Sequence, residues 1–480
     1  MKRLVIALIF VPIFIVVAQT ARVKAPPSDS TPSDVLAIDG PTAARNLSAV
    51  LAIPSVSGAS DAPAIAPFAR LHEVLANRFP LAHSHLRLEK FHGGSLLYTW
   101  NGTDPSLDPL LLLAHLDVVP ALGEWTHPAF SGHIDEEGWI WGRGAIDDKT
   151  SVTSILAATE ALIESDFRPR RTVIIALGHD EETGGHKGAL RMSKHLATRE
   201  IHPMLVLDEG GLVTTGIMPG LDRPVATVGV SEKGYLTVEL VVRSEGGHAS
   251  MPAKESAVGI LARAITQLEN NPMPSSLGPV PRAMFTALCP HMGIVNRAVF
   301  ANLWLTAPMV KSFMGRTAST RAMLHTTTAP TMLQGSPQDN VLAVVAKGWV
   351  NFRILQGDTV DSVLRHVRET IDDERVEVIA LPTSAEPSAV SPTSGKIYDL
   401  VRRSIQQAVP DVVVAPYPVV GATDARHYAS LTPHVYRFLP LHLRSADDLA
   451  RIHGIDERVH TDDVVRSIQF YGQLIRNSSD

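Results

Sequence analysis

The chain has 480 residues, of which 45% are hydrophobic and 19% charged, a composition typical of a globular protein and not of a disordered one. Its formal net charge of −6 comes from 43 basic and 49 acidic residues, which gives no electrostatic reason to expect nucleic acid as a partner. The length predicts two or three domains. The single cysteine, Cys289, cannot form an internal disulfide, so the fold must depend on its core.

The first 21 residues have the pattern of a secretory signal peptide. A basic start, Met-Lys-Arg, precedes an apolar run over residues 4–18, and cleavage is expected after Ala18 or Ala21. We therefore expect the protein to be secreted or delivered to another extracytoplasmic or vacuolar compartment. The run is short for a membrane span, although an uncleaved anchor is the alternative. Residues 22–38, rich in Pro, Ser and Asp, predict a flexible lead-in.

Two helices and two strands come next, and the second strand carries the first chemically informative residues. Apolar residues spaced three and four apart predict helices over 43–52 and 66–78, and a strand follows at 96–100. The apolar run 110–119 predicts a strand that contains His115 and Asp117. Residues two apart in a strand share a face, so the imidazole should lie near a carboxylate that could fix its tautomer for metal binding. A buried His–Asp pair with a structural role is the alternative.

Residues 133–149 predict a hairpin that leaves Asp147 at its end, followed by a helix over 149–165. The stretch 172–188 then predicts a buried strand that ends in Glu181, Glu182 and two glycines. The adjacent glutamates suggest a metal ligand, Glu182, beside a proton carrier, Glu181. A solvated acidic turn is the alternative for this motif taken alone.

Another short apolar strand within residues 203–211 ends in Asp208, Glu209 and two glycines, after a helix expected over 187–198. Strands that alternate with helices predict a mostly parallel sheet of the α/β class, in which these polar strand ends meet at one edge. Converging carboxylates would repel one another unless a cation held them, and two cations explain so many acids better than one. Nitrogen and oxygen ligands without cysteine suit Zn²⁺, with Co²⁺ or Mn²⁺ as substitutes.

Residues 236–384 follow a different order, β-α-β-β-α-β, which predicts a ferredoxin-like domain inserted into the first. The expected strands lie at 236–242, 322–327, 348–355 and 376–381, and the helices at 257–268 and 360–371. The apolar, Pro-rich segment 272–316 predicts extra helices. These helices could form an apolar pocket or a membrane-facing surface, or they could pack in the core. The predicted boundaries are therefore 39–230 and 385–480 for the catalytic domain and 231–384 for the insert.

The α/β order returns after the insert. We expect a helix over 396–408, strands at 412–415 and 434–439, and a final helix over 462–475. His453 lies between the last two of these elements, and a lone histidine is usually structural. It becomes a candidate ligand because the predicted cluster still lacks one.

Six stretches carry a resemblance to a known family. They are AHLDVV (114–119), WGRGAIDDK (141–149), GHDEETGG (178–185), LDEGG (207–211), GGHASMP (246–252) and HGIDE (453–457). Together they resemble the aminoacylase / carboxypeptidase S family of two-zinc hydrolases, nearest the branch of carboxypeptidase S and the secreted N-acyl-amino-acid hydrolases. The resemblance implies a mostly parallel-sheet zinc-peptidase domain with an inserted ferredoxin-like lid or dimerisation domain.

The resemblance also implies a metal-ligand set. Asp147 would bridge both ions, His115 and Asp208 would complete one site, and Glu182 and His453 would complete the other.

The same resemblance assigns the remaining roles. Asp117 would orient the ligating histidine, and Glu181 would be the general base and acid. His248, on the insert, would help to hold the oxyanion, in some relatives from the other subunit of a homodimer. The expected substrate-binding residues are Asn340, Arg353 and Arg426, and arginine is well suited to hold a carboxylate with two hydrogen bonds.

The implied activity is hydrolysis of the amide bond of short peptides or N-acyl amino acids with a free carboxylate, by a metal-activated bridging water. An N-fatty-acyl-amino-acid hydrolase that also runs in the synthetic direction is an alternative, and so is two-metal phosphoester hydrolysis. A binding protein that has lost catalysis is a third, against which the intact Glu181 argues. A serine hydrolase is disfavoured because the chain contains no G-x-S-x-G elbow.

Overall fold

The computed structural model describes residues 13–25, 35–58, 65–216 and 220–479. Residues 13–22 form a helix, whereas the start of the predicted signal peptide and residues 26–34 of the predicted lead-in lie outside the described residues. Within these described ranges, no helix is both long enough and apolar enough to cross a bilayer.

A ten-stranded sheet forms the centre of the larger domain, in the order β1-β2-β6-β3-β7-β17-β9-β8-β18, with β16 paired to β9. Its strands are β1 (Arg87–Phe91), β2 (Ser95–Trp100), β3 (Leu110–His115), β6 (Val173–Gly178), β7 (Leu205–Asp208), β8 (Val213–Thr214), β9 (Val225–Glu232), β16 (Val413–Val419), β17 (Val435–Arg437) and β18 (His442–Leu443). The pairs β3–β6, β3–β7, β7–β17, β9–β16 and β8–β18 are parallel. The α/β class expected from the sequence is confirmed.

Helices cover both faces of this sheet. They are α2 (Gly40–Leu51), α3 (Ile65–Arg78), α4 (Pro80–His85), α5 (Lys149–Glu164), α6 (Ala189–Thr198), α13 (Lys396–Ala408) and α15 (Thr461–Ser478). Every residue of β2, β3 and β6 is buried, which explains the continuous apolar runs in β3 and β6. Along β3, Leu110 and Leu112 join the core with α2, α5, α13 and α15, whereas Leu111 and Leu113 join the core with α6.

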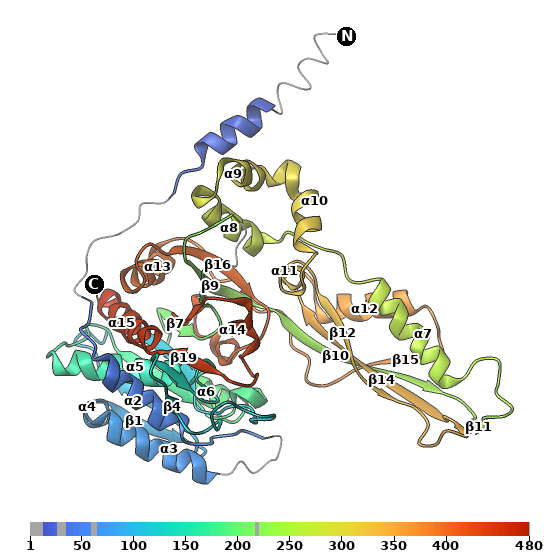
Figure 1. The fold of residues 1–480 in the computed structure, drawn as a ribbon, viewed down its shortest axis with the longest axis horizontal. Coiled ribbons are helices and arrows are strands. Elements are labelled where there is room, and N and C mark those ends of the chain that lie inside the picture. Colours follow the sequence, from blue (N-terminus) through green and yellow to red (C-terminus); the bar gives the residue numbers. More distant parts are fainter. Residues whose placement is uncertain (1–12, 26–34, 59–64, 217–219, 480) are drawn as a thin grey trace.

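The insert is a four-stranded antiparallel sheet in the order β12-β14-β10-β15, covered by two helices. Its elements are β10 (Gly234–Arg243), α7 (Ala257–Asn270), β12 (Thr327–Gln334), β14 (Val345–Ile354), α12 (Val360–Ile371) and β15 (Val376–Ala380). This order is the ferredoxin-like one. Figure 1 shows the insert extending away from the central sheet, with β11 (Gly247–His248) at its far end, where it pairs with β13 (Val341–Leu342).

One strand of the insert differs from its prediction. The short helix α11 (Ala318–Ala322) takes the place where the strand was expected to begin, and β12 starts only at Thr327. β12 contains Pro330, next to a register shift against β14. Proline removes a hydrogen-bond donor, and the position of β12 at the edge of the sheet accommodates this loss.

The segment predicted as extra helices contains α8 (Pro279–Leu288), α9 (Ile294–Ala301) and α10 (Leu303–Met314), which are helical as expected. Met284 and Leu288 pack with Val413 and Ala415 of β16, so these helices rest on the larger domain and not on the insert's own sheet. In Figure 1 they lie beside the N-terminal helix.

A three-stranded sheet, β19-β5-β4, completes the described fold next to α15. Its strands are β4 (His133–Ile134), β5 (Trp139–Trp141) and β19 (Arg458–His460). It joins the segment that ends in Asp147 to the segment that follows His453, because β19 pairs with β5.

Candidate metal centre

The polar residues that follow three parallel strands meet at one edge of the central sheet. His115 is the last residue of β3, and it pairs with Gly178, the last residue of β6. A short 3-10 helix, η1 (Glu181–Thr183), follows β6, and Asp208 ends β7. This register places the ends of β3 and β6 at the same level, so the convergence expected from the sequence is present.

Asp147 lies between two histidines that come from opposite ends of the chain. Its Oδ1 is 2.8 Å from Nε2 of His115, and its Oδ2 is 3.0 Å from Nε2 of His453. Glu182 also approaches His453, with 3.2 Å between Oε2 and Nε2. The structure therefore brings together four of the five residues predicted as ligands.

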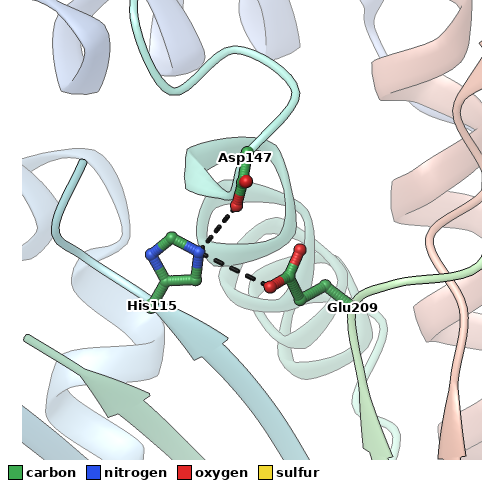
Figure 2. A group of neighbouring side chains, drawn as sticks. All are labelled: His115, Asp147 and Glu209. Carbon is green, nitrogen blue, oxygen red and sulfur yellow. Dashed lines mark hydrogen bonds and ion pairs between the residues drawn. The ribbon is translucent and has the colours of Figure 1, made fainter. Parts of the chain in front are cut away.

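The fifth predicted ligand, Asp208, faces away from this cluster. Its Oδ1 accepts a hydrogen bond from the N–H of Glu209 at 3.0 Å, and its Oδ2 accepts one from the N–H of Ala425 at 2.7 Å. Glu209 faces the cluster instead: its Oε1 is 3.7 Å from Nε2 of His115, on the same side as Asp147 (Figure 2). Neighbouring side chains point in opposite directions at the end of a strand, so only one of the two acids can face the cluster.

Asp117 connects the end of β3 to the segment that carries Glu181 and Glu182. Its two carboxylate oxygens accept hydrogen bonds from the N–H groups of Glu181 and Glu182, both at 3.1 Å. Nδ1 of His115 lies 3.0 Å from the main-chain oxygen of Asp117 and 3.5 Å from its Oδ1. A proton on Nδ1 satisfies these oxygens and leaves Nε2 free to bind a cation.

Glu457, which the sequence analysis did not select, binds the main-chain N–H groups of Asp147 and its neighbours. Its Oε1 accepts hydrogen bonds from the N–H groups of Ile146 and Asp147, and its Oε2 accepts from Gly144 and from Nη1 of Arg143. Arg143 in turn donates from Nη2 to the carbonyl oxygens of His453 and Gly454. The sequence signal for Glu457 was its position as the last residue of the HGIDE motif. No local sequence pattern identified the groups that its carboxylate binds.

The charges of the cluster are those of a cation site. Burial raises the pKa of Glu181 and of Glu209 well above the usual value for a glutamate, because neighbouring acids add repulsion to the loss of water. Hydrogen bonds to Asp147 and Glu182 raise the pKa of His453 to about 10. A bound cation would relieve the repulsion in a cluster that contains such an excess of acids.

The donor atoms also fit metal ions. Three groups, each of two acids with one histidine, offer ligand atoms within 4.8 Å of one another: His115, Asp147 and Glu209; His115, Glu181 and Glu182; and Asp147, Glu182 and His453. Oε1 of Glu182 is buried and has no hydrogen-bond partner among the described residues. A buried acceptor without a donor is costly unless a cation completes its environment. Imidazole nitrogens with carboxylate oxygens are a donor set that zinc accepts.

Of the two predicted substrate-binding arginines, Arg426 lies beside the cluster, and Arg353 lies close enough to Arg426 to be affected by its charge. Arg426, on η3 (Asp424–Tyr428), donates from Nη2 to the carbonyl oxygen of Gly184 at 2.8 Å, two residues beyond Glu182. Arg353 of β14 stacks on the ring of Tyr235, and burial together with the charge of Arg426 lowers the pKa of Arg353. Two guanidinium groups that repel each other in this way can be stabilised by one carboxylate placed between them.

His248 and Asn340 lie elsewhere. Both are exposed, and the carbonyl oxygen of Asn340 accepts a hydrogen bond from the N–H of Ala249. His248 belongs to β11, and Asn340 directly precedes β13, at the far end of the insert (Figure 1). Within one described chain, the structure does not bring His248 to the metal cluster.

The fold and the cluster together define a hydrolase of the metallopeptidase class. Residues 111–477 match the model of peptidase family M20/M25/M40, and the chain belongs to this family, as its motifs predict.

Three comparisons illustrate this membership. The chain is 42% identical over 415 residues to probable carboxypeptidase S-like 2 of Dictyostelium discoideum, covering 86% of this chain and 79% of that protein. It is 40% identical over 437 residues to N-fatty-acyl-amino acid synthase/hydrolase PM20D1 of Xenopus tropicalis, covering 90% and 85%. Sso-CP2, an M20 family metallo-carboxypeptidase from Sulfolobus solfataricus, has the same fold, with a TM-score of 0.65 over 91% of this chain and 99% of that one at 18% identity.

Proposed function

We propose that this protein is a two-zinc hydrolase that cleaves the amide bond of N-acyl amino acids or short peptides with a free carboxylate. The observation that carries the proposal is Asp147, whose two oxygens lie 2.8 and 3.0 Å from the imidazoles of His115 and His453. A carboxylate between two imidazoles is suited to be shared by two cations.

The proposed ligand sets follow from these distances. Asp147 would be shared, with His115 and Glu209 at one ion and Glu182 and His453 at the other. Zn²⁺ fits the donors best, and Co²⁺ or Mn²⁺ would substitute for it. When bound, the pair of ions would lower the pKa of a water molecule and polarise the amide carbonyl.

The chain's own residues then move the protons and hold the substrate. Glu181 accepts the proton of the attacking water, the new C–O bond forms, and the same carboxyl group gives that proton to the nitrogen as the C–N bond breaks. The hydrogen bond from its own N–H to Asp117 fixes the segment that carries it. Arg353 and Arg426 would hold the substrate carboxylate, and His248 with Asn340 would close on the carbonyl side from a partner subunit or after movement of the insert.

Glu181→Gln tests the assignment of the base. The variant should lower kcat about a thousandfold, within the range of general acid–base catalysis, because the amide cannot accept a proton. Its zinc content after dialysis, measured by elemental analysis, should equal that of the wild-type protein. Near-wild-type turnover would remove Glu181 from the mechanism, whereas loss of zinc would make it a ligand.

The acyl group is the remaining question, and the 40% identity to an N-fatty-acyl-amino acid synthase/hydrolase favours a long chain. We propose long-chain N-acyl amino acids as substrates, with net synthesis at high concentrations of fatty acid and amino acid. Liquid chromatography of products from a panel of dipeptides and N-acyl amino acids, with and without chelator, tests this. Chelator-sensitive cleavage of dipeptides alone would restrict the enzyme to peptidase activity.

The predicted signal peptide remains part of the proposal, together with secretion or delivery to a vacuole-like compartment. Determination of the amino terminus of the mature protein would show whether cleavage follows Ala18 or Ala21.

A further inference from the structure

The helices α9 and α10 expose more apolar surface than a solvent-facing segment requires. Leu305, Met309 and Phe313 recur every fourth residue along α10, and each side chain is more than half exposed. Ile294 and Val295, at the start of α9, are about 70% exposed. Residues spaced in this way share one face of a helix, and a grouped apolar surface, unlike scattered single residues, indicates a binding partner.

Charges along the segment that carries α9 and α10 are of one sign. Between Glu269 and Asp339 the sequence contains no aspartate or glutamate, but it contains Arg282, Arg297, Lys311, Arg316 and Arg321. Among the residues that the structure describes, none of these five cations makes an ion pair with an acid, although the chain as a whole has more acids than bases. Unpaired positive charge beside exposed apolar side chains is complementary to an anionic lipid surface.

The helix over residues 13–22 lies on the same surface. Nδ2 of Asn302 donates to the carbonyl oxygen of Val16 and to Oγ1 of Thr20, and Nε1 of Trp304 donates to Oε1 of Gln19. The docked helix, residues 13–22, exposes Phe14, and its apolar sequence extends back to Leu4. Figure 1 shows this helix beside α9 and α10, at one end of the molecule.

We propose that α9 and α10 form a surface that lies on an anionic lipid bilayer, with the apolar side chains inserted and the basic ones at the headgroups. The docked N-terminal helix belongs to this surface until the predicted signal peptide is removed. Trp304 is suited to the boundary between these layers, because its ring is apolar and its N–H is polar. The surface is separate from the metal cluster, so the proposal does not rest on the proposed function.

Vesicle binding by the full chain tests the proposal. The wild-type protein should sediment with vesicles of phosphatidylcholine and phosphatidylserine, and at least tenfold less with phosphatidylcholine alone or in high salt. The double variant Leu305→Glu, Met309→Glu should lose at least tenfold in affinity for the anionic vesicles. Ile65→Glu is the matched control, because Ile65 is equally exposed, but on α3 of the catalytic domain. It should bind as the wild-type protein does.

A second pair of substitutions keeps the test independent of folding in α10. Arg316→Glu with Arg321→Glu changes two exposed side chains and should weaken binding to anionic vesicles by a similar factor. Wild-type binding by both double variants would overturn the proposal, because the apolar amino terminus would then account for binding alone. The proposal would also be overturned if the wild-type protein did not bind anionic vesicles. The same holds if the α10 double variant dissociated a dimer of this chain without any change in vesicle binding.

Discussion

At the scale of single residues, Glu457 connects two loops that carry proposed ligands. Its carboxylate pairs with Arg143 at 2.7 Å, across 314 residues of sequence, and both side chains are fully buried. Through the N–H of Asp147 and the carbonyl oxygen of His453, this pair touches the backbone of both loops. A shift of the pair would therefore move two ligands relative to each other.

We predict that Glu457→Gln weakens both the fold and the metal site. The amide leaves the guanidinium of Arg143 buried without a counter-charge, which should lower the free energy of unfolding by about 3 to 5 kcal/mol. Misplacement of Asp147 and His453 should lower zinc affinity by about 10- to 100-fold, as for other residues that orient ligands. Chemical denaturation and a zinc titration against a competing chelator measure the two effects.

Glu255→Gln is the control for this substitution. Glu255 also pairs with arginines, at 2.5 Å to Arg263 and 2.7 Å to Arg375, but on the exposed surface of the insert. Exposed pairs contribute little, so its zinc affinity and stability should match those of the wild-type protein. Equal behaviour of the Glu457 and Glu255 variants would show that the buried pair does not orient the ligands.

A second residue-scale prediction distinguishes Glu209 from Asp208. Glu209→Gln should lower affinity for the ion bound with His115, because its carboxylate faces that imidazole. Asp208→Asn should retain both ions and lower the free energy of unfolding by about 1 to 3 kcal/mol, because one of two buried N–H groups loses its acceptor. Metal content after dialysis decides between them, and loss of an ion from the Asp208 variant alone would restore the assignment made from the sequence.

At the scale of elements, local patterns predicted the helices and the convergence of strand ends well, whereas the position of a strand within its sheet and the direction of single side chains were not predicted. The helices expected over 360–371 and 396–408 match α12 and α13 in both bounds, because their apolar spacing reports the buried face directly. β12 was displaced, since the sequence does not reveal that an edge position accommodates Pro330. The choice between Asp208 and Glu209 depends on side-chain direction at a strand end, which a motif does not contain.

Lys233, at the junction of β9 and β10, gives stability a dependence on pH. Its Nζ donates to the carbonyl oxygen of His325 at 2.6 Å, and burial, with the charge of Arg353, lowers the pKa of Lys233 to about 8. An unfolded lysine titrates near 10.4. Between these values the unfolded chain binds more protons, so the free energy of unfolding rises with pH through this window.

We predict that Lys233→Met removes this rise. The wild-type protein should gain up to about 3 kcal/mol relative to the variant between pH 8 and 10.5, by the linkage of pKa to stability. Denaturation at a series of pH values measures the difference. The exposed Lys194→Met is the control and should retain the wild-type slope. A Lys233 variant with that same slope would show that the ammonium group is not desolvated in the folded protein.

At the scale of the whole molecule, the metal cluster and the tip of the insert belong to different domains. The cluster lies at the edge of the central sheet, whereas β11, which carries His248, is at the far end of the insert (Figure 1). A proposed oxyanion-binding residue so placed must come from another copy of the chain or travel with the whole insert. Oligomers of identical chains are usually symmetric. In a dimer, the insert of each subunit would therefore place its His248 at the cluster of the other subunit.

Complementation separates these two arrangements. Glu181→Gln and His248→Ala should each be nearly inactive. When both are produced together, a mixed dimer places the intact Glu181 of one chain opposite the intact His248 of the other. Random pairing makes about half of the dimers mixed, each with a single intact site, so about a quarter of wild-type activity should return. Activity equal to the sum of the two parent variants would show that His248 serves its own chain, and closure of the insert would then be the step to measure.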